Sequence, residues 1–497
     1  MRKLASLLLV TTLCAGCSDN FLSPKPQSSI TTGNFYQTPD EINQAVNGVY
    51  AGMHNWASNI YIMMSEVRSP NYMGVSHNAQ RDWWDITTFT VKPEDGIVES
   101  VWGDLYQMIN RANMVLASVD NVDFGSSTAE RTQYVAEARF LRALAYFQLV
   151  RLYGNVPLVT KVITPQEGIE IKQSAPAEVY DFITSEMSAV ADSLPTSYTP
   201  SDVGRLTKYA AEGLLAKVYL TEAGYPVKKA AALGNAAPLL QDVIAHEGAG
   251  YSLAQNYKDL FTYKNDNKYD LFEIQYLSGG VGAGSSFPMD IAPADAHVSV
   301  VPFRAQISPN ELQLSDDLLG AYEPGDERFD ATIDTVYLSS VTDTLTTYGH
   351  TPWISKFIDQ GLNLSDFRDW PENFPLLRFA DVLLMDAEVR AGLANAPTPE
   401  AVAEINRVRD RAGLAPVNPG SKAEFDQILR NERRIEFVGE GKYWFDLVRW
   451  GNAVNVMNDW FNATAQDIQI DEHNLVYPIP QSEIDIFPGL YQQNPGY

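Results

Sequence analysis

Apolar residues recur every three or four positions along several long stretches of the chain, the spacing that places them on one face of a helix. The segments with this pattern are Pro39–Trp56, Ile97–Val119, Thr128–Tyr153, Tyr209–Ala223, Pro375–Leu393 and Ala401–Leu414. Thr38 directly precedes the first of them and suits its N-cap position. The pattern therefore predicts that most of the chain is α-helical.

The densest pattern lies in Phe425–Trp450, FDQILRNERRIEFVGEGKYWFDLVRW. An apolar stripe with five interleaved charges comes first, and Gly439 and Gly441 then supply a helix stop and a turn with positive φ. An aromatic run follows, in which Asp446 and Arg449 are spaced to pair across one turn. We predict two helices packed antiparallel across the short turn, with aromatic rings between them. Because charges framing an apolar helix usually solvate or lock it, we interpret this block as scaffold.

Two regions lack the helical period. In Ala57–Val91 it gives way to Asn, Gly, Ser and aromatic residues, which predicts a long irregular segment. The pattern also weakens from Tyr251 to about Ser365. There Leu271–Leu277 has the character of a strand, a glycine run breaks it, and Thr335–Leu338 alternates as in a hairpin. We predict an insertion at about 251–365 that carries loops and a small sheet.

The N-terminus has the form of an export signal. Arg2 and Lys3 precede an apolar run that is too short to span a bilayer. The following LCAGC resembles the lipobox of bacterial lipoproteins, in which the final cysteine, here Cys17, is acylated. We predict a signal peptide at 1–16 and a lipidated tether at 17–30; an ordinary secretory signal cut near Ala15 or Gly16 is the alternative. No other stretch approaches 18 apolar residues, so the lipid would be the only membrane attachment.

Composition narrows the classes of function. The 497 residues include 62 acidic and 36 basic ones, and the net charge of −26 at pH 7 argues against nucleic acid and polyanionic partners. The run GGVGAG lacks the spacing and lysine of a phosphate loop, and the six His show no metal-binding spacing. We predict neither a cofactor nor a metal site. A glycosidase needs only two carboxylates about 5–9.5 Å apart, which a sequence cannot show, so a glycoside hydrolase remains an alternative.

The strongest candidate for a binding site is a cluster of aromatic residues in the early irregular segment. Trp56, Tyr61, Tyr72, Trp83, Trp84 and Phe89 are interleaved with Asn71, Asn78, Gln80 and Arg81. Sugar rings stack on aromatic faces, while their hydroxyls bind amide and guanidinium groups. Adjacent residues of an extended chain point opposite ways, so we expect one of Trp83 and Trp84 to be buried and the other exposed. The alternative is that both tryptophans only anchor the loop on the core.

Three strings closely resemble the SusD/RagB family, the cell-surface nutrient-binding lipoproteins of Gram-negative bacteria. They are the C-terminal block Phe425–Trp450, the string AEARFLRALAYFQLVRLYGNVPLV in the first half, and the tail YPIPQSEIDIFPGLYQQNPGY. The resemblance implies one domain at 31–497, mainly α-helical with tetratricopeptide-like helix pairs and the irregular insertion. Small and large apolar residues alternate in Tyr209–Ala223, as interlocking helix pairs require. In this family the C-terminal block belongs to the scaffold.

The resemblance also implies a function: capture of oligosaccharide or polysaccharide and its delivery to a SusC-like TonB-dependent transporter at the outer membrane, with no catalytic residue. RagB-type members bind peptides instead, which is the alternative within the family; the clustered tryptophans favour sugar, and the acidic charge favours a neutral glycan. The family's ligand surface combines the early irregular region with loops of the insertion. The expected ligand contacts are Trp83, Trp84, Arg81, Asn78 and Tyr72, then Phe287, Phe303 and Trp353 from the insertion.

Overall fold

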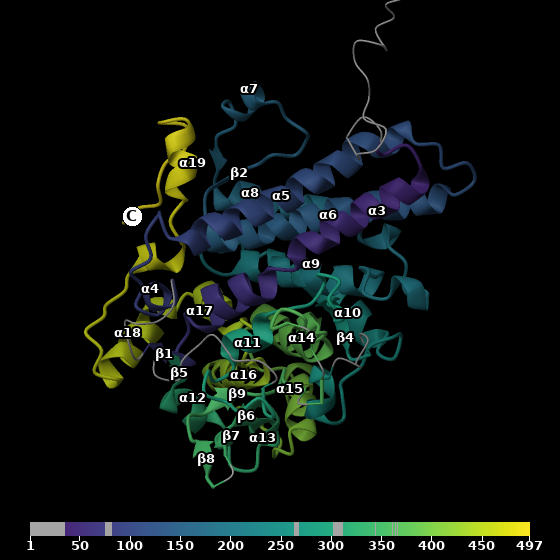
Figure 1. The fold of residues 1–497 in the computed structure, drawn as a ribbon. Helices are drawn as coiled ribbons and strands as arrows, with labels where there is room; N and C mark the ends of the chain where they lie inside the picture. Colours follow the sequence, from purple (N-terminus) through teal and green to yellow (C-terminus); the bar gives the residue numbers. More distant parts are fainter. Residues whose placement is uncertain are drawn as a thin grey trace, which may run out of the picture.

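The computed structural model describes residues 35–497 except 75–81, 263–267, 302–311, 343, 360, 363 and 365. Its long helices are α3 (Pro39–Tyr50), α5 (Gly96–Ser118), α6 (Thr128–Tyr153), α8 (Pro176–Val190), α9 (Lys208–Ala223), α10 (Ala232–Ala245), α14 (Phe379–Ala394), α15 (Pro399–Arg411) and α16 (Lys422–Glu436). Each packs against the next along most of the series, from α5 on α6 through α8, α9, α10 and α14 to α15 (Figure 1). This chain of neighbouring helix pairs confirms the mainly α-helical, tetratricopeptide-like prediction.

Local sequence accounts for most helix boundaries. The Thr38 side chain accepts a hydrogen bond from the Glu41 amide at 3.3 Å and completes a capping box at the start of α3, as its position predicted.

The predicted helix from Pro375 was wrong at its start. Residues Phe374–Arg378 form strand β10, which pairs antiparallel with β4 (Asp270–Ile274), and the helix begins only at Phe379. All five residues of β10 are buried, so the run has no alternation of buried and exposed positions that separates strand from helix.

The early segment is more regular than the sequence indicated. Residues Ala57–Glu66 form η2, a π-helix whose side chains are mostly buried, and it is followed by β1 (Tyr72–Gly74) and α4 (Trp83–Thr87). The prediction of an irregular stretch was therefore wrong over its first ten residues. A π-helix bonds residue i to i+5 and winds more loosely than an α-helix, so its buried residues do not follow the period of 3.6.

Short elements make up the region between α10 and α14. They are α11 (Phe287–Ile291), α12 (Asp316–Ala321), α13 (Arg328–Thr332), β5 (Leu312–Leu314), β6 (Ile333–Asp334), β7 (Tyr337–Val341), β8 (Thr346–Gly349) and β9 (Trp353–Ile354). The sheets among the described residues are all two-stranded, and β7 pairs with β8 as a hairpin. A separate small apolar core, which includes Met289, Tyr337, Trp353 and Trp370, supports these pieces. They lie in the lower half of the molecule in Figure 1.

The remaining elements are short: η1 (Ala51–Met53), η3 (Val119–Asn121), β2 (Val156–Pro157), α7 (Pro165–Gly168), β3 (Gln173–Ser174), η4 (Ala191–Ser193), η5 (Pro200–Asp202), η6 (Tyr257–Phe261), α17 (Tyr443–Arg449), α18 (Ala453–Ala463), η7 (Glu472–Leu475) and α19 (Gln481–Ile486). Within the described part of the chain, no helix combines the length and the apolar character needed to cross a bilayer.

The two helices of the C-terminal block do not pack as the predicted antiparallel pair. Helix α16 lies against α14 and α15, whereas α17 lies against η2, α9 and α18. The turn between them has positive φ at Gly439 and Gly441, as predicted. It presses so closely on η2 that a Cβ on Gly441 would lie 2.1 Å from the Tyr61 carbonyl oxygen. The two helices still touch through the Arg433–Asp446 ion pair at 2.8 Å and through Arg434, whose guanidinium carbon lies 4.9 Å from the centre of the Tyr443 ring.

Candidate functional site

The early segment and the region after α10 meet in a two-stranded ribbon. Strand β1 pairs antiparallel with β5, with Tyr72 opposite Leu314 and Gly74 opposite Leu312. Two further hydrogen bonds extend the contact: the Ser315 amide donates to the Asn71 carbonyl at 2.9 Å, and the Ser315 hydroxyl donates to the Pro70 carbonyl at 2.5 Å. The ribbon thus joins parts of the chain that are far apart in sequence.

A small apolar cleft of about 20 Å³, the Tyr72–Trp353 cleft, lies beside this ribbon. Its other lining residues are Ile291, Ala292, Pro293, Leu312, Leu314, Thr351 and Pro352. Both the Tyr72 hydroxyl and the Trp353 indole nitrogen are buried with no hydrogen-bond partner among the described residues. Unpaired buried donors are costly, so a water or a ligand hydroxyl that enters the cleft would stabilise each of them by a hydrogen bond. Burial, with a smaller contribution from Glu66, holds the pKa of Tyr72 well above its usual range, so the hydroxyl keeps its proton.

Helix α4 packs against β1 on the same side. A Cβ at Gly74 would lie 2.7 Å from the Thr87 hydroxyl and 3.6 Å from the Trp84 ring, so the glycine permits this close approach. Trp83 is buried, and Trp84 is half-buried. The expectation of one buried and one exposed tryptophan rested on an extended chain. That premise was wrong because the pair begins a helix, in which adjacent side chains are about 100° apart and not opposed.

The other predicted contact residues divide into two groups. Phe287 is 0% exposed and packs edge-on against Phe357 and Phe374 in the main core, so it cannot contact a surface ligand in this conformation. Asn78, Arg81 and Phe303, like the acylation candidate Cys17, lie outside the described residues. Gly74 precedes the segment of Asn78 and Leu312 follows the segment of Phe303, and these two residues are paired in the ribbon.

The C-terminal block fixes the segment that leads into β1. The Gly441 amide donates to Glu66 at 2.9 Å, and the Ser65 hydroxyl donates to the Gly441 carbonyl at 2.7 Å. The Asn71 amide group donates to Glu66 at 2.8 Å and accepts from Arg434 at 2.9 Å. Burial raises the pKa of Glu66, although the hydrogen bonds from Asn71 and Gly441 oppose the shift. Asn71 directly precedes Tyr72, so these bonds hold the cleft in register with the scaffold.

Arg68 is a second attachment between the same segment and the C-terminal part of the chain. Its guanidinium carbon lies 4.1 Å from the centre of the Phe89 ring, 4.3 Å from that of Tyr477 and 5.2 Å from that of Trp444. It donates to the Asn474 carbonyl at 2.6 Å. A buried guanidinium enclosed by three aromatic rings gains cation–π attraction from each, which offsets part of the cost of removing it from water.

The charges of the C-terminal block form a buried ion-pair network. Arg378 pairs with Glu436 and Glu440, each at 2.8 Å, and Arg433 pairs with Asp381 at 2.9 Å and Asp446 at 2.8 Å. Burial alone would raise the pKa of Glu440, but its cationic neighbours lower it to about 2. The predicted pair of Asp446 and Arg449 is present at 2.8 Å. The network agrees with the interpretation of this block as scaffold, but the burial of its charges was not predictable, since a helix with charges at this density is usually solvated.

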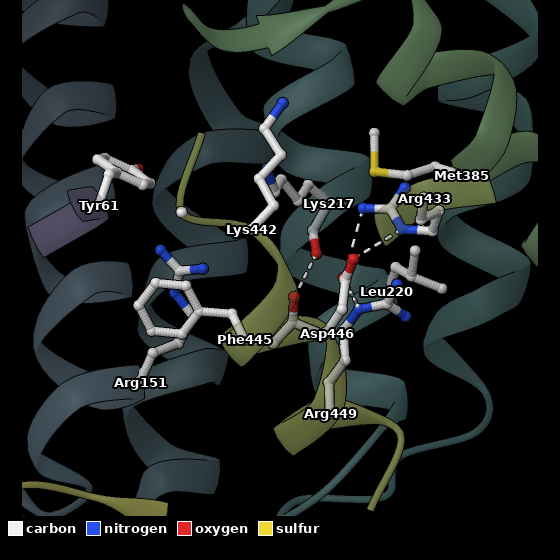
Figure 2. Close-up of a pocket in the computed structure, with 12 residues that line it drawn as sticks. Tyr61, Arg151, Lys217, Leu220, Met385, Arg433, Lys442, Phe445, Asp446 and Arg449 are labelled. Carbon is white, nitrogen blue, oxygen red and sulfur yellow. Dashed lines mark hydrogen bonds and ion pairs between the residues drawn. The ribbon is translucent and has the colours of Figure 1, made fainter. Parts of the chain in front are cut away.

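A narrow pocket in this network, drawn in Figure 2, has room of only about 10 Å³. Arg433 and Arg449 point toward Asp446 within it, whereas the ammonium group of Lys442 points away from them (Figure 2). Because its Arg433, Asp446 and Arg449 side chains are already paired within the protein, the pocket is part of the scaffold.

The acidic pair on β4 does not form an accessible catalytic site. Asp270 and Glu273 are both buried, and burial raises the pKa of each, but neither is accessible to a saccharide chain. Among the described residues no group of three His, Cys, Asp or Glu side chains could hold a metal ion.

Comparison with known families and proteins covers nearly the whole chain. Residues 227–497 match the model described as the SusD family, and residues 20–220 match the model described as starch-binding, associating with the outer membrane. A SusD-like protein of Bacteroides ovatus is 31% identical over 93% of this chain and 84% of its own length.

Solved structures agree with the fold. A SusD homologue from Bacteroides thetaiotaomicron superposes with a TM-score of 0.80 at 25% identity, covering 94% of this chain and 98% of its own. A laminarin-binding SusD-like protein superposes with a TM-score of 0.77 at 27% identity, covering 93% of this chain and all of its own.

Proposed function

Since this chain belongs to the SusD family, we propose that it binds an oligosaccharide or polysaccharide at the cell surface and does not cleave it. The observation that carries the proposal is the Tyr72–Trp353 cleft, in which two buried donors without partners among the described residues face a small apolar space where the early segment meets the insertion. Trp84 lies next to it and is partly exposed. An accessible ring beside placed hydrogen-bond donors is the combination that sugar recognition uses.

The likeness to laminarin-binding and starch-binding relatives supports a neutral glucan as the first ligand to test. The net charge of −26 adds to this, because it disfavours sulfated or uronic chains at long range. We place Asn78, Arg81 and Phe303 in the same ligand surface as part of the proposal.

Delivery to a SusC-like TonB-dependent transporter, and attachment to the outer membrane through acylated Cys17, complete the proposal. The family model's description, which includes association with the outer membrane, supports the location. Residues 1–16 would then be the signal peptide, 17–30 the tether and 31–497 the binding domain, with the insertion at about 251–365.

Affinity electrophoresis in gels that contain laminarin, starch or an alginate, together with a peptide digest as competitor, tests the proposal. We expect retardation by one neutral glycan, no release of reducing sugar, and no competition by peptide. Steady release of reducing sugar would instead indicate a hydrolase, and retention that only peptide relieves would indicate a peptide binder.

Two variants locate the site. Trp84→Ala is expected to weaken glycan binding by about thirtyfold if the ring is a central platform. Tyr348→Ala, at an exposed aromatic on the β7–β8 hairpin, serves as the matched control and should bind as wild type does. If Trp84→Ala stays folded and binds with unchanged affinity, the ligand surface lies elsewhere.

A further inference from the structure

A larger cavity, of about 190 Å³, lies at the C-terminal end of α6 and shares no lining residue with the Tyr72–Trp353 cleft. Its walls come from the last turn of α6, the first turn of α8, the Tyr225–Pro226 turn, α17 and η7. Most of the lining is apolar or aromatic, including Tyr180, Tyr225 and Phe445. An apolar cavity of about 150 Å³ is enough for benzene, so this one has room for a six-membered ring with a small substituent.

Arg151 is the feature that gives this cavity chemical selectivity. Its guanidinium carbon lies 4.1 Å from the centre of the Phe147 ring and 3.9 Å from that of Phe445, so the group is held between two rings. It donates to the Phe147 carbonyl at 3.3 Å and to the Gln148 side chain. No carboxylate among the described residues forms an ion pair with it.

The contrast with Arg449, which lines the same cavity, is informative. Arg449 pairs with Glu388 at 2.6 Å and with Asp446 at 2.8 Å, and its charge is therefore compensated within the protein. Figure 2 shows Asp446 between Arg433 and Arg449, with Arg151 beside Phe445 and away from that cluster. Because no carboxylate of the described residues lies within ion-pair distance of the fixed, partly desolvated Arg151 guanidinium, a bound carboxylate would stabilise it.

We propose that this cavity binds a small aromatic carboxylate, with the carboxylate on Arg151 and the ring between Tyr180 and Phe445. The Tyr180 hydroxyl, from a residue that lines the cavity, supplies a second donor. Glu472 also lines the cavity and is exposed, so it opposes an anion at the rim and favours the orientation with the carboxylate at Arg151. This site is separate from glycan capture, and its test stands independently of that function.

Titration calorimetry with benzoate and its neutral isostere benzamide tests the proposal on the purified protein. We expect benzoate to bind with a Kd of about 1 mM or tighter, within reach of so small a ligand. Benzamide should bind at least about tenfold more weakly, since it cannot form the charged hydrogen bonds. Equal affinities for the two compounds, or no benzoate binding in this range, would overturn the proposal.

Three variants with one control assign the binding to this cavity. Arg151→Met keeps an unbranched stem between the rings and should abolish the preference for benzoate, whereas Glu472→Gln should strengthen benzoate binding. Val476→Phe fills part of the cavity without changing its charge and should weaken benzoate binding, which decides the matter if Arg151→Met melts early. Arg111→Met, at another arginine without an ion pair among the described residues but outside the cavity, should bind benzoate as wild type does. Undiminished binding by folded Arg151→Met or by Val476→Phe would contradict the assignment.

Discussion

Gly441→Ala is the substitution that most directly tests how the scaffold holds the candidate site. Gly441 has φ of +62°, and its amide and carbonyl bond to Glu66 and Ser65. A Cβ there would lie 2.1 Å from the Tyr61 carbonyl oxygen and 2.5 Å from the Tyr61 Cα, both rigid backbone atoms. The methyl group therefore forces the turn and η2 apart.

The expected cost has two parts. A non-glycine residue with left-handed φ costs about 1–2 kcal/mol, and forcing packed backbone apart typically costs a further ~1–3 kcal/mol. The sum, about 2–5 kcal/mol, is a large share of the ~5–15 kcal/mol that an ordinary domain has. Because η2 leads into Asn71 and Tyr72, we also expect weaker glycan binding in the fraction that remains folded.

Gly125→Ala separates the two parts. Gly125 has φ of +54°, is exposed, and has no atom within 4 Å of the position that a Cβ would take, so its substitution carries only the backbone cost. Urea denaturation followed by tryptophan fluorescence, with affinity electrophoresis on the same samples, measures both effects. If Gly441→Ala loses no more free energy of unfolding than Gly125→Ala, the close packing of the turn on η2 does not stabilise the protein as argued.

Three further predictions concern the anchor, the core and pH. Cys17→Ala should leave the folded protein unlipidated, and outer-membrane fractionation identical to wild type would rule out the lipid anchor. Trp444→Ala removes a ring that is 2% exposed and should cost ~3–5 kcal/mol in denaturation, in contrast to the tolerated Trp84→Ala; equal stability of the two variants would contradict the burial argument. Stability should peak near pH 4.5 in a pH series of melting temperatures. Glu440, whose pKa is lowered to about 2, loses its stabilising charge as pH falls from about 4.5 to 2, whereas Glu372, whose pKa burial raises to about 8, destabilises the fold as pH rises from about 4.5 to 8. A stability that rises steadily from pH 5 to 8 would contradict this balance.

Much of the helical fold was predictable because its information is local. Helix α6 begins and ends at the predicted residues, and α5 and α9 differ from prediction by one residue at their ends. The failures share a cause. Strand β10 and the π-helix η2 are buried on nearly all sides, so neither has a polar face whose period would reveal its geometry. The packing of α16 and α17 could not be predicted either, since it depends on η2, which lies near the other end of the chain.

The candidate site was predictable as a neighbourhood but not residue by residue. The aromatic cluster in the early segment and its pairing with the insertion correspond to the β1–β5 ribbon, and Tyr72 and Trp353 line one cleft. Phe287 was predicted from its aromatic character and its place in the insertion, both of which a core residue can share with a ligand contact. No local pattern separates the two, because burial of Phe287 is decided by Phe357 and Phe374, contributed by distant parts of the chain.

The density of buried charge in the C-terminal block has a physical rationale in the placement of the early segment. A purely apolar interface would tolerate small slips of η2 along the scaffold, because apolar contacts are not directional. The bonds of Glu66 to Gly441 and of Asn71 to Arg434 exist in one register only, and a slip would leave buried charged or polar groups without partners. We therefore interpret the network as specifying position more than adding stability. It fixes Asn71, and through the chain Tyr72, at the edge of a cleft whose two donors, unpaired within the described part of the chain, must be held in place to bind a ligand.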